Sequence, residues 1–594
     1  MQSAKFTLNY IKNSIIDLEE LQSQHKNLLE EDISNEYSPF IIDKLQSYNP
    51  IYAEFFEMNN NNFNKISFNH KYSIADLYTV IDNDTKQRKN MDIFIKFAPL
   101  LDPIRYMVGK YDLTNENIRT LPSYLYNESV CIPKLLTYHN TSYIDCFFSF
   151  LTSKLLHCHN FQHGLDFFGT YLGVQQKFKM NISDDLEFLN DSKFFADNIG
   201  KYYSLFNYKS NDLFMNNSRR NRKNIQIEDD CDIDCNILEN FIIEEIPSMT
   251  NSNSIIVPNE IDSTNDINLG IIDINNDQYC FDTGHSDIVI PNKIDDSDDS
   301  NEDEDDDDDD DDDDEEDEED EDENYEDIDE DEEDEEDEEN EDDDGVFVYI
   351  NNFPIQMICM EKCHGTFDEL FEKEIINDEN GASFLMQIIM ILITYQKMFK
   401  FTHNDLHTNN IMYINTDIEF LYYQYNSKLY KVPTYGKIIK IIDFGRSIYT
   451  FQNKIFCSDS FDICGDAHSQ YNFPPFYDNK KALIEPNYSF DLCRLGSSIF
   501  DFIIDIDNLI EFKKMNPLQQ IISEWCSDDN GKNILYKKNG KERYPNFKLY
   551  KMIARTVHKH IPSEQLNKKY FKQFKVGEIE SNIHIMNIDD MMTY

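Results

Sequence analysis

Two segments in the C-terminal third of the chain constrain its fold more than any other feature. The first, FTHNDLHTNNIMYI at residues 401–414, places Asp405 five residues before Asn410 in a polar loop. The second, KIIKIIDFG at residues 437–445, is a β-branched run that ends in Asp443. The side-chain oxygens of these three residues are therefore the first candidates for a functional site.

The three residue types match the small number of groups that phosphoryl transfer from ATP requires. That reaction needs a carboxylate to orient the acceptor hydroxyl and two oxygen ligands to hold magnesium on the phosphates. Asp405 fits the first role, and Asn410 and Asp443 fit the second. An Asp and an Asn five residues apart also occur in ordinary turns and helix caps. The order of the surrounding elements decides between these interpretations.

The elements around the two segments favour the functional interpretation. An apolar run at 384–395 predicts a buried helix before the loop, and NIMYI predicts a strand after it. Residues 419–433 predict an extra hairpin, and residues 487–504 predict a helix that carries Asp491. Each candidate residue thus lies at the end of a regular element.

The upstream half adds a lysine and an acid in similar settings. MDIFIKFA predicts a strand that carries Lys96, and residues 142–157 predict an amphipathic helix that carries Asp145. Residues 159–173 are interpreted as a pair of strands, and residues 346–363 as two strands that lead into a linker. An edge-strand surface lysine is the plainer alternative for Lys96, and a helix-start acid is the plainer alternative for Asp145.

This order resembles the signature of the protein-kinase-like superfamily, H-R-D-x-x-x-x-N followed by D-F-G. The resemblance implies an α+β, bilobal fold with a small β-rich N-lobe and a large helical C-lobe. It implies ATP and Mg²⁺ as cofactors, with Asp405 and Lys96 as catalytic residues and Asn410 and Asp443 as metal ligands. The other residues that it implies bind the nucleotide or support the site: Asp145, Met360, Glu361, Lys362 and Cys363 in the first group, and His403, Phe444, Gly445 and Asp491 in the second.

The predicted domains follow from shifts in composition along the chain. We expect a helical N-terminal extension, the first part of the N-lobe, a long insertion, the end of the N-lobe with the hinge, and the C-lobe. Their ranges are 1–62, 63–173, 174–345, 346–363 and 364–594.

The insertion contains the most acidic part of the chain. Residues 295–344 hold 43 Asp and Glu residues and no Lys or Arg, which accounts for most of the net charge of −61. Such a tract cannot bury enough apolar surface to offset its ordering entropy, so we expect disorder. It is interpreted either as a solvated spacer or as a segment that attracts basic proteins electrostatically. The segment 210–294 is left open, as short ordered elements or binding motifs.

Several departures from the signature keep the activity open. Asn404 stands where the superfamily has arginine, His407 stands where protein kinases carry lysine, and residues 1–108 contain no glycine. A glycine-rich loop lets backbone amides approach the phosphates, so a turn such as 68–70 would have to replace it. The first hypothesis is a divergent protein kinase that acts on Ser/Thr hydroxyls. The alternatives are a pseudokinase scaffold and, less favoured, a small-molecule kinase.

The remaining features bound the partners and the compartment. No dense basic stripe suggests nucleic-acid binding. The twelve cysteines lack zinc-ligand spacing beyond the pair Cys231 and Cys235, which favours reduced thiols. No secretory signal or membrane span is expected. The Ile/Asn/Lys-rich usage and SFDLCRLGSSIFDF resemble divergent kinase-like proteins of giant DNA viruses, which implies the host cytoplasm and packaging in the particle.

Overall fold

The computed structural model describes residues 6–13, 16–28, 37–206, 345–463, 465–505, 512–545 and 547–594. They combine α-helices with several small β-sheets, so the predicted α+β class is confirmed. All the described residues belong to one compact unit. The predictions for 210–294, 295–344 and the Cys231–Cys235 pair lie outside the described residues.

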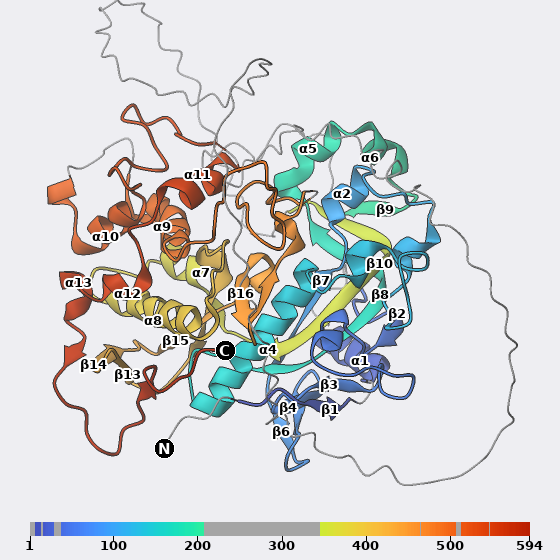
Figure 1. The fold of residues 1–594 in the computed structure, drawn as a ribbon, viewed down its shortest axis with the longest axis horizontal. Helices are drawn as coiled ribbons and strands as arrows, with labels where there is room; N and C mark the ends of the chain where they lie inside the picture. Colours follow the sequence, from blue (N-terminus) through green and yellow to red (C-terminus); the bar gives the residue numbers. More distant parts are fainter. Residues whose placement is uncertain are drawn as a thin grey trace, which may run out of the picture. The chain divides into compact units, whose positions relative to one another are not determined.

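The largest sheet carries Lys96 and is antiparallel throughout (Figure 1). Its strands follow the order β2-β8-β10-β7, and a further strand, β9, pairs with the first part of β10. Their bounds are Ile42–Gln46 for β2, Phe167–Asn181 for β8, Phe347–Glu361 for β10, Ile93–Pro99 for β7 and Tyr203–Phe206 for β9. Lys96 of β7 lies opposite Ile358 of β10, which lies opposite Thr170 of β8.

The two long strands correct the prediction of short strand pairs at 159–173 and 346–363. The first region contains the end of α4, a turn and the start of the single strand β8, and the second contains the single strand β10. Asn352 has a φ of 51°, so β10 bends there while its pairing with β8 continues on both sides. The predicted insertion also begins too early, because residues 174–206 complete this sheet and add the short helices α5 (Leu186–Asn190) and α6 (Lys193–Asn198).

The N-terminal residues form mixed structure rather than the predicted helical extension. They contain α1 (Leu18–Leu28) but also β2, which joins the main sheet beside β8. There are also two smaller sheets. One pairs β1 (Tyr10–Lys12) with β3 (Ile66–Phe68), and the other is the meander of β4 (Tyr72–Asp76), β5 (Thr79–Asp82) and β6 (Arg88–Asn90). The helix α1 therefore confirms part of the predicted extension, whereas residues 42–46 pair with β8 instead of forming helix.

The helix α4 (Thr141–His159) connects this half of the protein to the other. It begins at the N-cap Asn140, whose side chain accepts a hydrogen bond from the Ser142 N–H, and it ends at a left-handed Asn160. Its residues 142–153 are buried all around, although the sequence predicted an amphipathic helix. The sheet covers one side, and the residues that follow Asp443 cover the other.

The C-terminal half contains most of the long helices and the second part of the core. The elements that position the candidate residues are α7 (Phe367–Glu372), α8 (Gly381–Phe399), β12 (Ile411–Asn415), β15 (Lys437–Ile441), β16 (Ile448–Phe451), β17 (Lys454–Cys457), α9 (Phe490–Ile503) and α11 (Lys548–Thr556). The other elements of this half are β11 (Gly365–Thr366), α10 (Pro517–Trp525), α12 (Pro562–Gln565), α13 (Lys569–Lys572), β18 (Lys575–Val576) and β19 (Met586–Asn587), and the short helices α2 (Pro103–Met107) and α3 (Pro133–Leu136) precede α4. The predicted hairpin at 419–433 is confirmed as β13 (Phe420–Tyr425) and β14 (Lys428–Pro433).

The helix α8 is long and apolar enough to cross a membrane by length and composition. However, 94% of its most apolar window is buried inside the protein. It is therefore a core helix, as its apolar run predicted.

Candidate functional site

Three of the predicted residues meet directly around the Lys96 ammonium group. Lys96 Nζ lies 2.8 Å from Asp145 Oδ2 and 2.9 Å from Asp443 Oδ1. The other oxygen of Asp145 accepts a hydrogen bond of 2.9 Å from the Phe444 N–H. The strand β7, the helix α4 and the end of β15 thus each deliver one charged side chain to the same point.

The electrostatics of this triad set the protonation state of each member. Burial alone would lower the pKa of Lys96, but Asp145 and Asp443 outweigh it and raise that pKa. Burial raises the pKa of Asp145 despite the attraction of Lys96. The pKa of Asp443 is lowered, because Lys96 outweighs the opposing effect of burial. Lys96 therefore stays charged, and the Asp443 side chain, 45% exposed, presents an ionised carboxylate to solvent.

The loop that carries Asp405 is held by a buried carboxylate from α9. Asp491 Oδ1 accepts hydrogen bonds of 3.1 and 2.9 Å from the N–H groups of His403 and Asn404, and Asp491 Oδ2 accepts one of 2.9 Å from His403. His403 Nε2 lies 3.0 Å from the Ile442 carbonyl oxygen, directly before Asp443. These contacts join the two segments from which the sequence argument began.

Asn410 lies beside this junction. Its Nδ2 donates to the Asp405 carbonyl oxygen at 2.9 Å, and its own carbonyl oxygen accepts from the Ile442 N–H at 3.0 Å. The next residue, Ile411, pairs with Ile441 in the ladder of β12 and β15. The structure therefore brings Asn410 and Asp443 to the same end of two neighbouring strands.

The Asp405 carboxylate has partners that the sequence argument missed. Tyr550 of α11 donates its hydroxyl to Asp405 Oδ1 at 2.7 Å, and Arg494 Nε donates to the Tyr550 hydroxyl at 2.8 Å. Arg446 lies 3.8 Å from Asp405 Oδ2, and Arg494 lies 3.9 Å from Oδ1. Burial would raise the pKa of Asp405, but the two arginines outweigh it and lower that pKa. Of these partners, only Arg446 could have been predicted from the sequence, because it directly follows Gly445.

His407, the departure in the same loop, is uncharged at neutral pH. Burial, reinforced by Arg494, lowers its pKa to about 4. A neutral imidazole cannot replace the positive charge of a lysine. Arg494 and Arg446 instead supply the positive charge beside Asp405.

The predicted hinge, residues 360–363, is partly committed to internal contacts. Glu361 turns its side chain inward, where Oε1 accepts from Lys440 Nζ at 2.7 Å and from the Asp166 N–H at 2.8 Å. Its own N–H donates to the Asp166 carbonyl oxygen at 2.9 Å. Glu361 therefore fastens the end of β10 to β15, while Lys362 is exposed and donates its N–H to the Asp92 carbonyl oxygen at 3.1 Å, and Cys363 is half-buried.

The turn at residues 68–70, which was expected to cover the phosphates, packs on α4 away from Asp145. Phe68 is fully buried and stacks on Phe150 of α4, with ring centroids 4.7 Å apart. The Asn69 carbonyl oxygen accepts from Lys154 Nζ at 3.2 Å. Lys154 is nine residues beyond Asp145, which corresponds to about 14 Å along a helix. The turn at 68–70 thus packs on the far part of α4, because its aromatic residue belongs to the core.

The arrangement of donors fits a magnesium–phosphate ligand. Asn410 uses its amide NH₂ internally, which leaves the amide oxygen as a possible ligand, and Asp443 has a second carboxylate oxygen beyond the one that contacts Lys96. Among the described residues, no group of three or more His, Cys, Asp and Glu side chains is arranged to hold a metal alone. A cation here would need the phosphates for its remaining ligands. A cavity of about 590 Å³ between Ile376 and Leu518 is lined by none of the candidate residues.

A comparison of the chain with models of known protein families finds no match, and a comparison with curated proteins also finds none.

Proposed function

We propose that the protein is a divergent, Mg-ATP-dependent protein kinase with a bilobal fold, which transfers the γ-phosphate to Ser/Thr hydroxyls of proteins. The observation that carries the proposal is the position of Lys96 Nζ between Asp145 and Asp443, at 2.8 and 2.9 Å. A lysine in the middle of a paired strand and held by two carboxylates is fixed in position, which suits it to bind phosphate oxygens.

The roles of the residues follow from their contacts. Lys96 would bind the phosphates of ATP, and Asn410 and Asp443 would hold Mg²⁺, which would neutralise charge on those phosphates. Asp405 would orient the acceptor hydroxyl, taking its proton as the oxygen bonds to phosphorus and the bond to ADP breaks. The lowered pKa of Asp405 favours orientation over strong base catalysis. In the hinge, Cys363 would offer backbone groups to the adenine.

A transfer assay on the full chain tests this proposal. Purified protein is incubated with Mg²⁺, labelled ATP and a basic acceptor protein, and the phosphate on protein is measured. We expect Asp443→Ala to abolish transfer and Asp417→Ala to leave it unchanged, because Asp417 is exposed in the connection between β12 and β13. If wild-type protein shows no thermal shift with Mg-ATP, the enzymatic proposal fails.

A pseudokinase scaffold is the second candidate, and two observations favour it. The hydrogen bond from Tyr550 to Asp405 uses an oxygen that an acceptor hydroxyl would need, and residues 1–108 supply no glycine for a phosphate loop. A Mg-ATP thermal shift without any transfer would support this candidate. Transfer to small alcohols but not to proteins would instead indicate a small-molecule kinase.

The proposed compartment is the cytoplasm. The described cysteines are free thiols, namely Cys131, Cys146, Cys158, Cys359, Cys363, Cys457, Cys493 and Cys526. Protein substrates and basic partners of the acidic tract are proposed as its interaction partners.

A further inference from the structure

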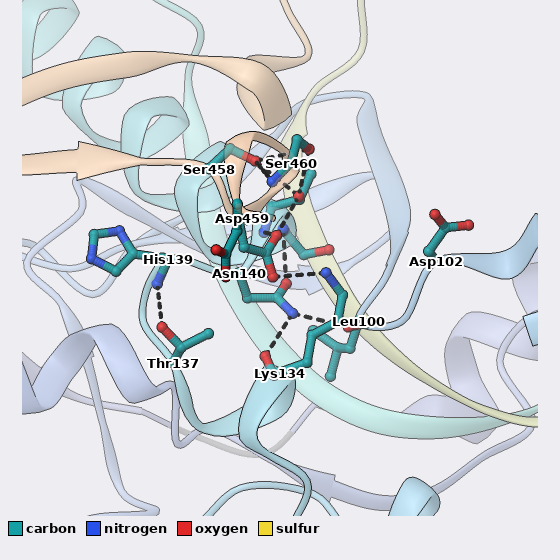
Figure 2. Close-up of polar contacts among 12 residues, drawn as sticks. Leu100, Asp102, Lys134, Thr137, His139, Asn140, Ser458, Asp459 and Ser460 are labelled. Atoms are coloured by element: carbon teal, nitrogen blue, oxygen red, sulfur yellow. Dashed lines mark hydrogen bonds and ion pairs between the residues drawn. The ribbon is translucent and has the colours of Figure 1, made fainter. Parts of the chain in front are cut away.

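A second polar cluster joins the start of α4 to the segment after β17 (Figure 2). At its centre is Asp459, whose side chain is 9% exposed. Its Oδ2 lies 2.7 Å from Lys134 Nζ, and its Oδ1 accepts from the Thr141 N–H at 3.1 Å and from the Thr141 hydroxyl at 2.9 Å. One carboxylate therefore receives three donors from a segment more than 300 residues earlier in the chain.

Two of these donors belong to the first residue of α4. The first N–H groups of a helix have no partner within the helix, and a negative charge near them is stabilising. The N-cap Asn140 satisfies the N–H of Ser142, and Asp459 satisfies that of Thr141. The start of α4 is thus completed by a residue that lies outside the helix and follows β17.

Thr141 also connects Asp459 to the candidate site. It precedes Asp145 by four residues, so the two side chains lie on the same face of α4 in successive turns. Thr141 also packs closely against the residue after Phe444, because a Cβ on Gly445 would lie 2.9 Å from Thr141 Cγ2. The first turn of α4 therefore lies between Asp459 on one side and Gly445 on the other.

Backbone contacts strengthen the same connection. The Asp459 N–H donates to the His139 carbonyl oxygen at 2.8 Å, and His139 Nδ1 lies 2.8 Å from the Cys457 carbonyl oxygen. The rings of Phe148 and Phe444, with centroids 4.7 Å apart, also hold α4, but ring contacts tolerate small shifts along a helix. Directional hydrogen bonds do not, so the Asp459 cluster helps to fix where α4 begins along its axis, together with the bonds from Asn140 Nδ2 to the Leu100 carbonyl oxygen and from Ser142 Oγ to the Pro99 carbonyl oxygen.

We propose that Asp459 is a positioning residue that keeps Asp145 within reach of Lys96 by holding the first turn of α4. The inference rests on the proposed phosphoryl-transfer function, in which Lys96, held by Asp145, binds the phosphates of ATP. Loss of the carboxylate would then weaken the use of ATP and leave the acceptor side around Asp405 unchanged.

The decisive experiment is a double-mutant cycle of Asp459→Asn and Asp145→Asn. Both variants keep the shape of the side chain and remove its charge. We expect Asp459→Asn to lower kcat/KM for ATP by roughly tenfold, with the KM for the acceptor unchanged. Because Asp459 acts through Asp145, the double variant should lose no more than Asp145→Asn alone. Asp459→Glu keeps the carboxylate and should recover part of the loss.

Glu54→Gln is the matched control. Glu54 Oε2 lies 2.9 Å from Lys454 Nζ of β17, the strand that precedes Asp459, and Glu54 does not contact Thr141. The proposal would be overturned if the double variant lowered kcat/KM for ATP by the product of the two single effects. It would also be overturned if Glu54→Gln lowered kcat/KM for ATP as much as Asp459→Asn. If wild-type protein transfers no phosphate, the proposed function fails separately, and hydrogen exchange decides the inference. Faster exchange over residues 141–146 in Asp459→Asn than in Glu54→Gln would support it, and equal exchange would overturn it.

Discussion

Replacing Asp491 by alanine tests the anchor of the loop that carries Asp405, and its cost can be worked out from the contacts. The carboxylate is fully buried and accepts from the N–H groups of His403 and Asn404, two residues that are also fully buried. Leaving a buried N–H without a partner costs about 1–3 kcal/mol, so two of them cost about 2–6 kcal/mol. Burial raises the pKa of Asp491, which shows that burying its charge is unfavourable. Because Asp491→Ala also removes this buried charge, the expected loss in unfolding free energy lies in the lower part of that range, at about 2–4 kcal/mol.

The single tryptophan of the chain provides the assay. Trp525 is fully buried, and its Cβ would lie 3.0 Å from a Cβ on Gly496 of α9, the helix that carries Asp491. Urea unfolding followed by Trp525 fluorescence therefore reports on the packing of α9. Asp501→Ala is the control, because Asp501 is an exposed acid on the same helix, and it should cost less than about 1 kcal/mol.

Asp491→Asn should fall between these variants, because it keeps one acceptor oxygen and removes the charge. The reasoning is refuted if Asp491→Ala costs no more than Asp501→Ala. In that case the loop at His403 would be held by its other contacts, and the buried carboxylate would contribute nothing to its geometry.

Two further predictions concern the same loop. Tyr550→Phe should cost about 1.5–3 kcal/mol in urea unfolding, because it removes a charge-assisted hydrogen bond to Asp405; an unchanged midpoint would contradict this. The second concerns His407, whose pKa of about 4 lies below its ordinary value of 6.5. Between these two pH values the unfolded chain binds a proton that the folded protein does not, so stability falls as the pH drops from 6.5 toward 4. His407→Gln should lose less melting temperature than wild type between pH 7 and pH 5, and equal losses would show that His407 is not the source.

The parts of the site that the sequence predicted are those in which local pattern and position coincide. Asp405, Asn410 and Asp443 each lie at the end of an apolar element, and Asp491 lies at the start of a strongly periodic helix. Hydrophobic periodicity is the most informative signal in a single sequence, so residues at the ends of such elements can be placed. Their contacts with one another then follow from the pairing of β12 with β15.

The partners of Asp405 could not be predicted, because they depend on packing between distant segments. Tyr550 is 145 residues away in the chain and belongs to a helix whose pattern says only that one face is buried. The wrong predictions for strands in the N-terminal part of the chain and for β10 have a different cause. An apolar run cannot distinguish a bent strand such as β10 from two strands, and the strand β2 becomes evident only from its pairing with β8.

Asp145 links these two kinds of evidence. Under the proposed kinase-like fold it stands where that superfamily has glutamate, which has one more methylene and so reaches about 1.5 Å further. The carboxylate of the shorter Asp145 nevertheless lies 2.8 Å from Lys96 Nζ. The shorter side chain requires α4 to approach more closely, and only a glycine at 445 leaves room for Thr141 in that position. Gly445 and Asp459 thus both contact Thr141, one turn before the shortened acid, so we expect a change at either position to alter the distance between Asp145 and Lys96.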